Sequence, residues 1–213
     1  MPPLDYHHQD TWPNGFGQQQ SPIDLRDATA ADPSTLTIEE PWLVDQEIDD
    51  HVTIRLTGHG RTQIDQTQWH FIQAHLHVPA EHQTTHQCAA EWHFVHQSAI
   101  GALCVVAVLL PLGDGAPVMD SALDHFVTRS AQPVALQLDS LLPPKGTVYR
   151  YLGSLTTPPL TEGVTWYVID QTAVTISPHQ RQRFQQLFPD NHRQLQARND
   201  RPVLRGPFLQ GSK

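Results

Sequence analysis

The feature that most constrains the fold is a histidine-rich stretch at residues 71–96, FIQAHLHVPAEHQTTHQCAAEWHFVH, which holds six of the chain's 14 histidines. Its first half alternates in the way of a half-buried β-strand. Side chains two residues apart project from the same face of a strand, so Gln73, His75 and His77 share one face. The stretch therefore predicts a strand that presents two imidazoles side by side.

A second strand is predicted at residues 89–96, where Glu91 and His93 share one face and His96 takes the other. If the two strands are neighbours, the imidazoles of His75, His77 and His93 converge. Three neutral nitrogen ligands and one open position are typical of a catalytic zinc site, whereas four protein ligands close a structural site. We therefore predict a catalytic Zn²⁺ centre on these two strands.

Two further residues are suited to orient these ligands. A metal-bound histidine needs an acceptor for its other ring nitrogen, and Gln73 and Glu91 each precede a ligand histidine by two residues on the same face. A lone His-x-His pair in a histidine-rich chain is more often a surface pair than a ligand pair. The added Gln-x-His and Glu-x-His spacings reverse that judgement.

A competing metal site would use His82, His86 and Cys88. Their spacing is mixed, and His86 and its neighbours read as a turn. We expect this segment to be a solvated loop instead, with His82 buried beneath the main site.

The rest of the chain predicts a single β-rich domain over residues 1–213. Further strand-like runs occupy residues 36–38, 51–56, 103–110, 149–151 and 164–169, and a break is expected at residues 57–60. One helix is expected within residues 120–131. Another should begin after Ser177, with Pro178 in its first turn, and end near Leu187.

Composition excludes some classes of function. The 213 residues carry a formal net charge of −9, so neither a nucleic acid nor an anionic membrane surface is an expected partner. No apolar run is long enough for a spanning helix, and the first ten residues lack a signal pattern. A cytoplasmic location is expected; a periplasmic or secreted one is the alternative if a leader has been removed. Cys88 and Cys104 are expected to be buried free thiols.

Several blocks of sequence together resemble one family, the α-class carbonic anhydrases of bacterial type. These blocks are QSPIDL at residues 20–25, QAHLHVPAEH at 73–82, EWHFVH at 91–96, GSLTTPPLTEGVTWYV at 153–168 and NDRPV at 199–203. The resemblance extends over nearly the whole chain. It implies a mainly β fold with short helices, in which a large twisted sheet of about ten mostly antiparallel strands surrounds a conical cavity ending at zinc.

The resemblance also assigns roles around the metal. It makes His75, His77 and His93 the zinc ligands and implies that His77 contacts a backbone carbonyl near Asn199. Thr156 matches the threonine that accepts a hydrogen bond from zinc hydroxide, and Glu81 matches the glutamate that accepts the threonine's proton. Thr157 matches a position on the bicarbonate side of the site.

A proton shuttle and a substrate pocket are implied in the same way. His59 matches the shuttle histidine, although Thr57 stands where the family usually has asparagine; His7 and His8 are possible outer relays. A hydrophobic wall for carbon dioxide would be formed by Val95, Val105, Leu155, Val164 and Trp166. Independently of the resemblance, Val95 shares the strand face of His93. The disulfide of many secreted members cannot form, because Leu160 occupies one of its positions and no cysteine precedes Cys88, which favours a reducing compartment.

The function implied is that of a zinc lyase, carbonate dehydratase, which hydrates carbon dioxide reversibly to bicarbonate and a proton by zinc-hydroxide attack with histidine proton shuttling. The expected partners are carbon dioxide and bicarbonate, with sulfonamides and anions as inhibitors, and the protein is expected to be a monomer or a homodimer. Two alternatives stay open. One is a catalytically silent binding protein of this fold, and the other is a zinc-dependent esterase.

Overall fold

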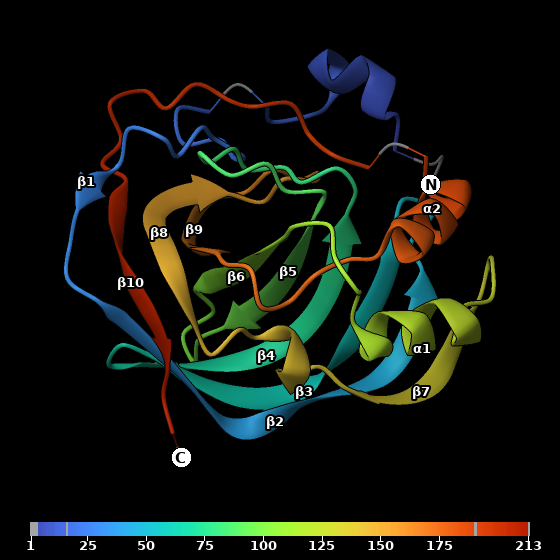
Figure 1. Cartoon of the computed structure of the whole chain (residues 1–213). Coiled ribbons are helices and arrows are strands. Elements are labelled where there is room, and N and C mark those ends of the chain that lie inside the picture. Colours follow the sequence, from blue (N-terminus) through green and yellow to red (C-terminus); the bar gives the residue numbers. More distant parts are fainter. Residues whose placement is uncertain (1–3, 16, 190, 213) are drawn as a thin grey trace.

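The computed structural model describes residues 4–15, 17–189 and 191–212 (Figure 1). Its centre is a ten-stranded sheet with the order β1-β10-β8-β9-β6-β5-β4-β3-β2-β7. The strands are β1 (Thr29–Ala30), β2 (Ser34–Asp49), β3 (Ile54–Ile64), β4 (Thr67–His77), β5 (Ala90–Gln97), β6 (Leu103–Leu110), β7 (Ala131–Gln137), β8 (Lys145–Ser154), β9 (Glu162–Asp170) and β10 (Leu204–Gln210). Among the strands that the structure describes, β6–β9, β1–β10 and β10–β2 pair in parallel, and the other pairs are antiparallel. The expected large, mostly antiparallel sheet is therefore confirmed.

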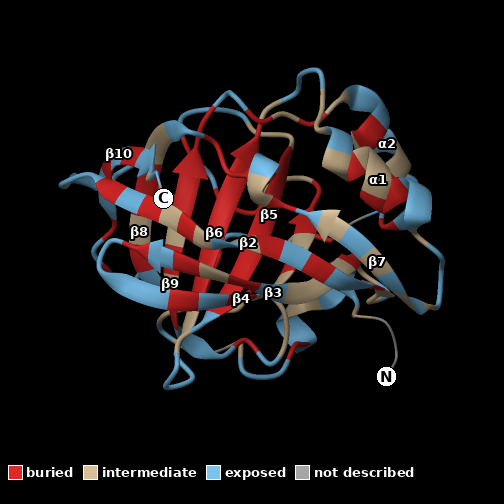
Figure 2. Ribbon diagram, turned by 90° about the horizontal axis from the view of Figure 1, so that it is seen from below, coloured by how far each residue is buried: buried red, intermediate tan, exposed pale blue. Residues whose placement is uncertain are grey.

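The middle of the sheet is buried on both faces. Every residue of β5 except the last is buried, and β6 is buried after its first residue (Figure 2). Two hydrophobic clusters cover the two faces. The larger one includes Met119 and Leu123 of α1 (Pro117–His125) and Phe184 of α2 (Pro178–Leu187). The smaller one contains Val95 and Trp166 and lies on the opposite face, which leaves that face for the site.

The helices follow the sequence signals to different degrees. Helix α2 has the expected bounds, because the Ser177 side chain accepts a hydrogen bond from the Gln180 amide in a capping box and Pro178 follows at the first helical position. Helix α1 was expected within residues 120–131, and that prediction is wrong at both ends. Pro117 begins the helix and Phe126 is already extended, so the chain from Ala131 forms the edge strand β7. Short 3₁₀ turns, η1 (Tyr6–Thr11) and η2 (Asp139–Leu141), complete the described elements. No helix in the described part of the chain is both long and apolar enough to cross a bilayer.

Strand β3 corrects another expectation. The sequence Thr57-Gly58-His59-Gly60 was predicted to break the strand, but β3 continues from Ile54 through Ile64. Gly58 is needed for close packing rather than for a turn, because a Cβ there would lie 1.9 Å from the carbonyl oxygen of Leu43 on β2. The β2–β3 pairing is bulged in this region, and the bulges place His59 opposite Leu43.

Candidate metal centre

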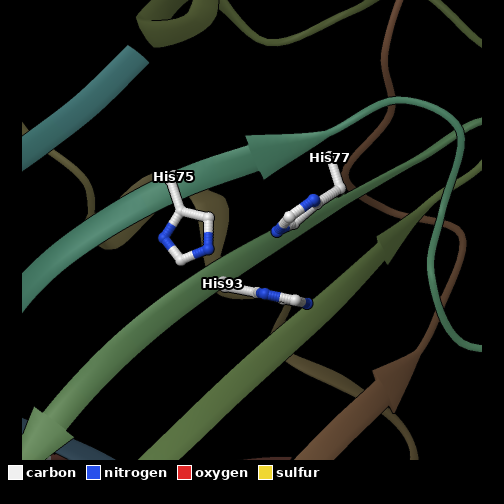
Figure 3. A group of neighbouring side chains, drawn as sticks. All are labelled: His75, His77 and His93. Atoms are coloured by element: carbon white, nitrogen blue, oxygen red, sulfur yellow. The ribbon is translucent and has the colours of Figure 1, made fainter. Parts of the chain in front are cut away.

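The centre of the site is built by one pair of neighbouring strands. Strands β4 and β5 pair antiparallel with His75 directly opposite His93 and with His77 opposite Glu91. Opposed residues project from the same face of a sheet, so the three histidine rings gather on one side. Figure 3 shows the three imidazoles turned toward one another, and one ring nitrogen from each lies within 4.8 Å of the other two.

The second nitrogen of each ring is held by an oxygen. His75 Nδ1 lies 2.9 Å from Gln73 Oε1, and His93 Nε2 lies 2.9 Å from Glu91 Oε1. Both contacts join the residue pairs that the strand spacing predicted. They leave Nε2 of His75 and Nδ1 of His93 available on the inner side.

The partner of His77 differs from the expectation. Its Nδ1 donates to the backbone carbonyl of Asn191, whereas Asn199, the residue predicted for this place, directs its side-chain amide to the Gln18 carbonyl at 3.0 Å. The Asn191 side chain also bridges the end of β4, since it accepts from the Val78 amide at 2.8 Å and donates to the Leu76 carbonyl at 2.7 Å. The contact to His77 is made by a main-chain oxygen, which every residue type has, so the sequence does not identify the residue that provides it. Both Asn191 and Asn199 lie in this region of the chain.

The environment keeps the three rings neutral. Burial, together with the neighbouring rings of His77 and His93, holds the pKa of His75 well below its usual range. Burial also lowers the pKa of His77 to about 4 and lowers that of His93. Neutral imidazoles are the form that binds metals.

An unpaired atom supports the fit to a metal. His77 Nε2 is buried and has no hydrogen-bond partner. A buried polar nitrogen without a partner is costly, and three such rings meeting at one point match a nitrogen donor set for Zn²⁺. The residues present therefore fit the ion that the sequence predicted.

A buried carboxyl lies beside this centre. Glu81 Oε1 accepts from the Arg193 amide at 2.7 Å, while Oε2 is buried without a hydrogen bond and lies 3.9 Å from His93 Nε2. Burial raises the pKa of Glu81 to about 7; the charge of Glu91 acts in the same direction, and His93, the Arg193 amide and the nearby Thr156 hydroxyl oppose it. Thr156 is itself buried. The structure thus brings together the predicted pair, Glu81 and Thr156.

The competing set of His82, His86 and Cys88 is not assembled. His82 is buried, with Nδ1 2.6 Å from Glu91 Oε1 and Nε2 2.7 Å from the Tyr151 hydroxyl. His86 lies 2.9 Å from Asp170 instead. Among the described residues, the only other group with metal-ligand spacing is His82, Glu91 and His93, whose members already bind one another. The expectation that His82 is buried beneath the site is met.

The predicted wall lies against the metal centre. Val95, Val105, Val164 and Trp166 belong to one buried cluster, and the partly buried Leu155 packs on it. The ring of Trp166 meets that of His93 edge to face, with centroids 4.9 Å apart. Thr157 is half-buried next to Thr156.

The predicted shuttle residue, His59, is more exposed than the three histidines of the metal centre. His59 extends from β3, two residues after Thr57, which pairs with Gln73 of β4. Its Nδ1 lies 2.9 Å from Asp45 Oδ2, and both side chains are mostly exposed. His7 and His8 lie on η1, where His8 Nδ1 contacts Asp5 at 2.7 Å. The relay roles of these histidines stay predictions.

Comparison with known proteins agrees with this geometry. The family model of eukaryotic-type carbonic anhydrases matches residues 5–206. The chain belongs to the carbonic anhydrase family. Its class of enzyme is therefore the lyase predicted from the sequence, and the predicted resemblance is confirmed.

Individual relatives show how far the similarity extends. A carbonic anhydrase of Pectobacterium carotovorum is 34% identical over 198 residues, which cover 88% of this chain and 80% of that protein. The solved α-carbonic anhydrase of Photobacterium profundum is 31% identical with a TM-score of 0.83, covering 93% of this chain and 94% of the other. That of Thermovibrio ammonificans, solved with the inhibitor sulfanilamide, is 28% identical with a TM-score of 0.79 over 89% of this chain and 88% of the other.

Proposed function

We propose that the protein is a zinc-dependent carbonic anhydrase that uses His75, His77 and His93 as ligands and His59 as proton shuttle. The observation that carries this proposal is the meeting of three neutral imidazoles, each with its outer nitrogen held by an oxygen. In carbonic anhydrases, for which this value is established, Zn²⁺ lowers the pKa of a coordinated water to about 7 and so makes hydroxide available at neutral pH.

The apolar wall provides a place for carbon dioxide. The substrate is uncharged, so it can leave water for a surface formed by Val95, Val105 and Trp166 without the penalty that an ion would incur. Trp166 and Val95 both lie next to His93, because Val95 follows it on the same face of β5 and Trp166 contacts its ring. Carbon dioxide on this wall would lie beside the metal centre.

Thr156 and Glu81 orient the oxygen nucleophile at the metal centre. The free Oε2 of Glu81 is available to accept the proton of the Thr156 hydroxyl. Thr156 Oγ1 would then be left as an acceptor toward the metal centre, and an oxygen nucleophile there would donate its proton to Thr156 and keep a lone pair for carbon dioxide. A bound dication would lower the pKa of Glu81 and favour its acceptor form.

Each cycle releases a proton, and His59 is the group proposed to carry it to solvent. An imidazole is suited to exchange protons near neutral pH. The exposure of His59 gives it contact with buffer, and its position on the strand that pairs with β4 directs it to the same face as Gln73. The route between His59 and the metal would run through water.

One experiment separates this proposal from its alternatives. Metal content, carbon dioxide hydration and ester hydrolysis are measured on the same preparation, with and without a sulfonamide. We expect about one zinc per chain, fast hydration and loss of hydration on adding the sulfonamide, the class of inhibitor bound in the Thermovibrio relative. Zinc without hydration but with ester hydrolysis would indicate an esterase. A protein with neither activity would be a binding protein of this fold.

A further inference from the structure

An arginine that the proposed mechanism does not use lies on β3, the strand next to β4, which carries His75 and His77. Strand β3 pairs with β4 so that Leu56 faces Ala74 and Thr57 faces Gln73. Continued by one residue, this register would bring Arg55 opposite His75. Opposed residues of an antiparallel pair project from the same face of the sheet, so the Arg55 side chain leaves β3 on the face that carries the histidine ligands.

The guanidinium of Arg55 has unused donors. Its Nε is buried and has no hydrogen-bond partner, and its recorded charge partner is Asp50, with NH1 3.3 Å from Oδ2. Both side chains of this pair are a little over one-third exposed. An arginine has five N–H donors in a planar fork that fits a carboxylate-like anion, so a single long contact leaves most of them free.

The surroundings of Arg55 are acidic. The chain has a formal net charge of −9, and Asp45, Asp49 and Asp50 lie on or next to the end of β2, the strand that pairs with this part of β3. Arg55 therefore supplies a positive charge among carboxylates.

We propose that Arg55 is a specificity-determining residue that attracts and holds the anionic partner of the reaction, bicarbonate, at the wall of the metal centre. This proposal rests on the proposed function, in which neutral carbon dioxide and anionic bicarbonate share one site. Carbon dioxide, which has no charge, occupies the apolar wall around Val95 and Trp166. Arg55, on another strand, supplies the positive charge that anionic bicarbonate requires. Asp50 competes with this anion for the guanidinium of Arg55.

The competition by Asp50 provides a test. Cobalt(II)-substituted protein reports anion binding through its visible absorption, independently of turnover, and is titrated with thiocyanate and with bicarbonate at low ionic strength. Arg55→Gln should weaken both anions by about fivefold, and Arg55→Lys, which keeps the charge, should recover most of the loss. Asp50→Asn should tighten both by about twofold, because it frees the guanidinium.

A purely structural role of the ion pair predicts a different pattern. The only role of Arg55 could be to hold Asp50 in the connection between β2 and β3. In that case Arg55→Gln and Asp50→Asn would change anion binding in the same direction, and both would lower the Tm. That result, or equal anion affinity in Arg55→Gln and the unaltered protein, overturns the proposal for Arg55. Absence of any metal-dependent anion binding in the unaltered protein would instead contradict the proposed function.

Discussion

Glu91 shows how one residue can determine the chemistry of several others. Its Oε1 lies within hydrogen-bond distance of His82 Nδ1 and of His93 Nε2. Its Oε2 accepts hydrogen bonds from the backbone amides of Glu81 and His82, at 2.8 Å each. Burial alone would raise the pKa of Glu91, but His82 and His93 hold it well below the usual range. A carboxylate so fixed keeps Nε2 of His93 outward, and Nδ1 is therefore the nitrogen offered to a metal.

Replacement of His59 by alanine should slow turnover mainly in dilute buffer. The proton would then have to leave without an imidazole relay, and we expect a loss of about tenfold or more at low buffer that added imidazole restores. Carbon dioxide hydration is measured at several buffer concentrations. His70→Ala is the matched control, because His70 is also exposed and lies on the neighbouring strand β4. Equal loss in both variants, or none at any buffer concentration, would refute the shuttle role.

Glu47 should make folding stability depend on pH. It is buried on β2, its Oε2 has no partner, and Gln132 reaches Oε1 only at 3.4 Å. Burial raises its pKa in the folded protein. The folded state therefore retains a proton that the unfolded state has released, so stability falls as pH rises from the ordinary pKa of a glutamate toward the raised one.

Glu47→Gln removes this titration. Relative to the variant, the unaltered protein should lose unfolding free energy as the pH rises from the ordinary pKa of a glutamate through the raised pKa of Glu47, and the difference should then level off. Thermal unfolding of both proteins across that range checks it. Parallel pH profiles would show that the Glu47 carboxyl does not titrate differently in the folded protein.

At the scale of elements, the close pairing of β2 and β3 depends on Gly58. Gly58→Ala should destabilise the protein by about 2–4 kcal/mol, because the new Cβ overlaps the Leu43 carbonyl and the two strands must separate. Gly101→Ala is the control: Gly101 has a φ of 86° but nothing within 4 Å of the added carbon, so only backbone strain of about 1 kcal/mol applies. Urea unfolding measures both, and equal losses would mean that crowding at Gly58 is relieved without cost.

Elements with their own local signal were predictable from the sequence. Alternation gave β4, the apolar run gave β6 with its bounds, and Ser177-Pro178 gave the start of α2. The ligand set followed because His75, His77 and His93 need only strand periodicity and one pairing. Strand β7 and the extension of β2 could not be predicted, since their residues are ordered by pairing with distant strands, and neither could the contact between His77 and the Asn191 carbonyl.

At the scale of the whole molecule, the candidate metal centre joins segments that are far apart in the chain. His75 and His77 lie on β4, His93 on β5, and the Asn191 carbonyl that holds His77 comes from the segment after α2. The three neutral rings face one another in a buried site, and His77 Nε2 has no hydrogen-bond partner. Zinc would bind the folded chain and not the unfolded one, so its binding free energy adds to folding stability.

Removal of zinc with a chelator should therefore lower the Tm of the protein and leave the fold intact. With free zinc at about 1,000 times its dissociation constant, the stabilisation is about 4 kcal/mol, which corresponds to a Tm shift on the order of 10 °C for a chain of this size. Thermal unfolding is compared for the zinc-loaded, stripped and reloaded protein. His93→Ala, which lacks one ligand, is the control and should show almost no shift. If the stripped and loaded proteins melt at the same temperature, or if the His93→Ala variant responds as strongly as the unaltered protein, zinc does not join these segments through the three histidines.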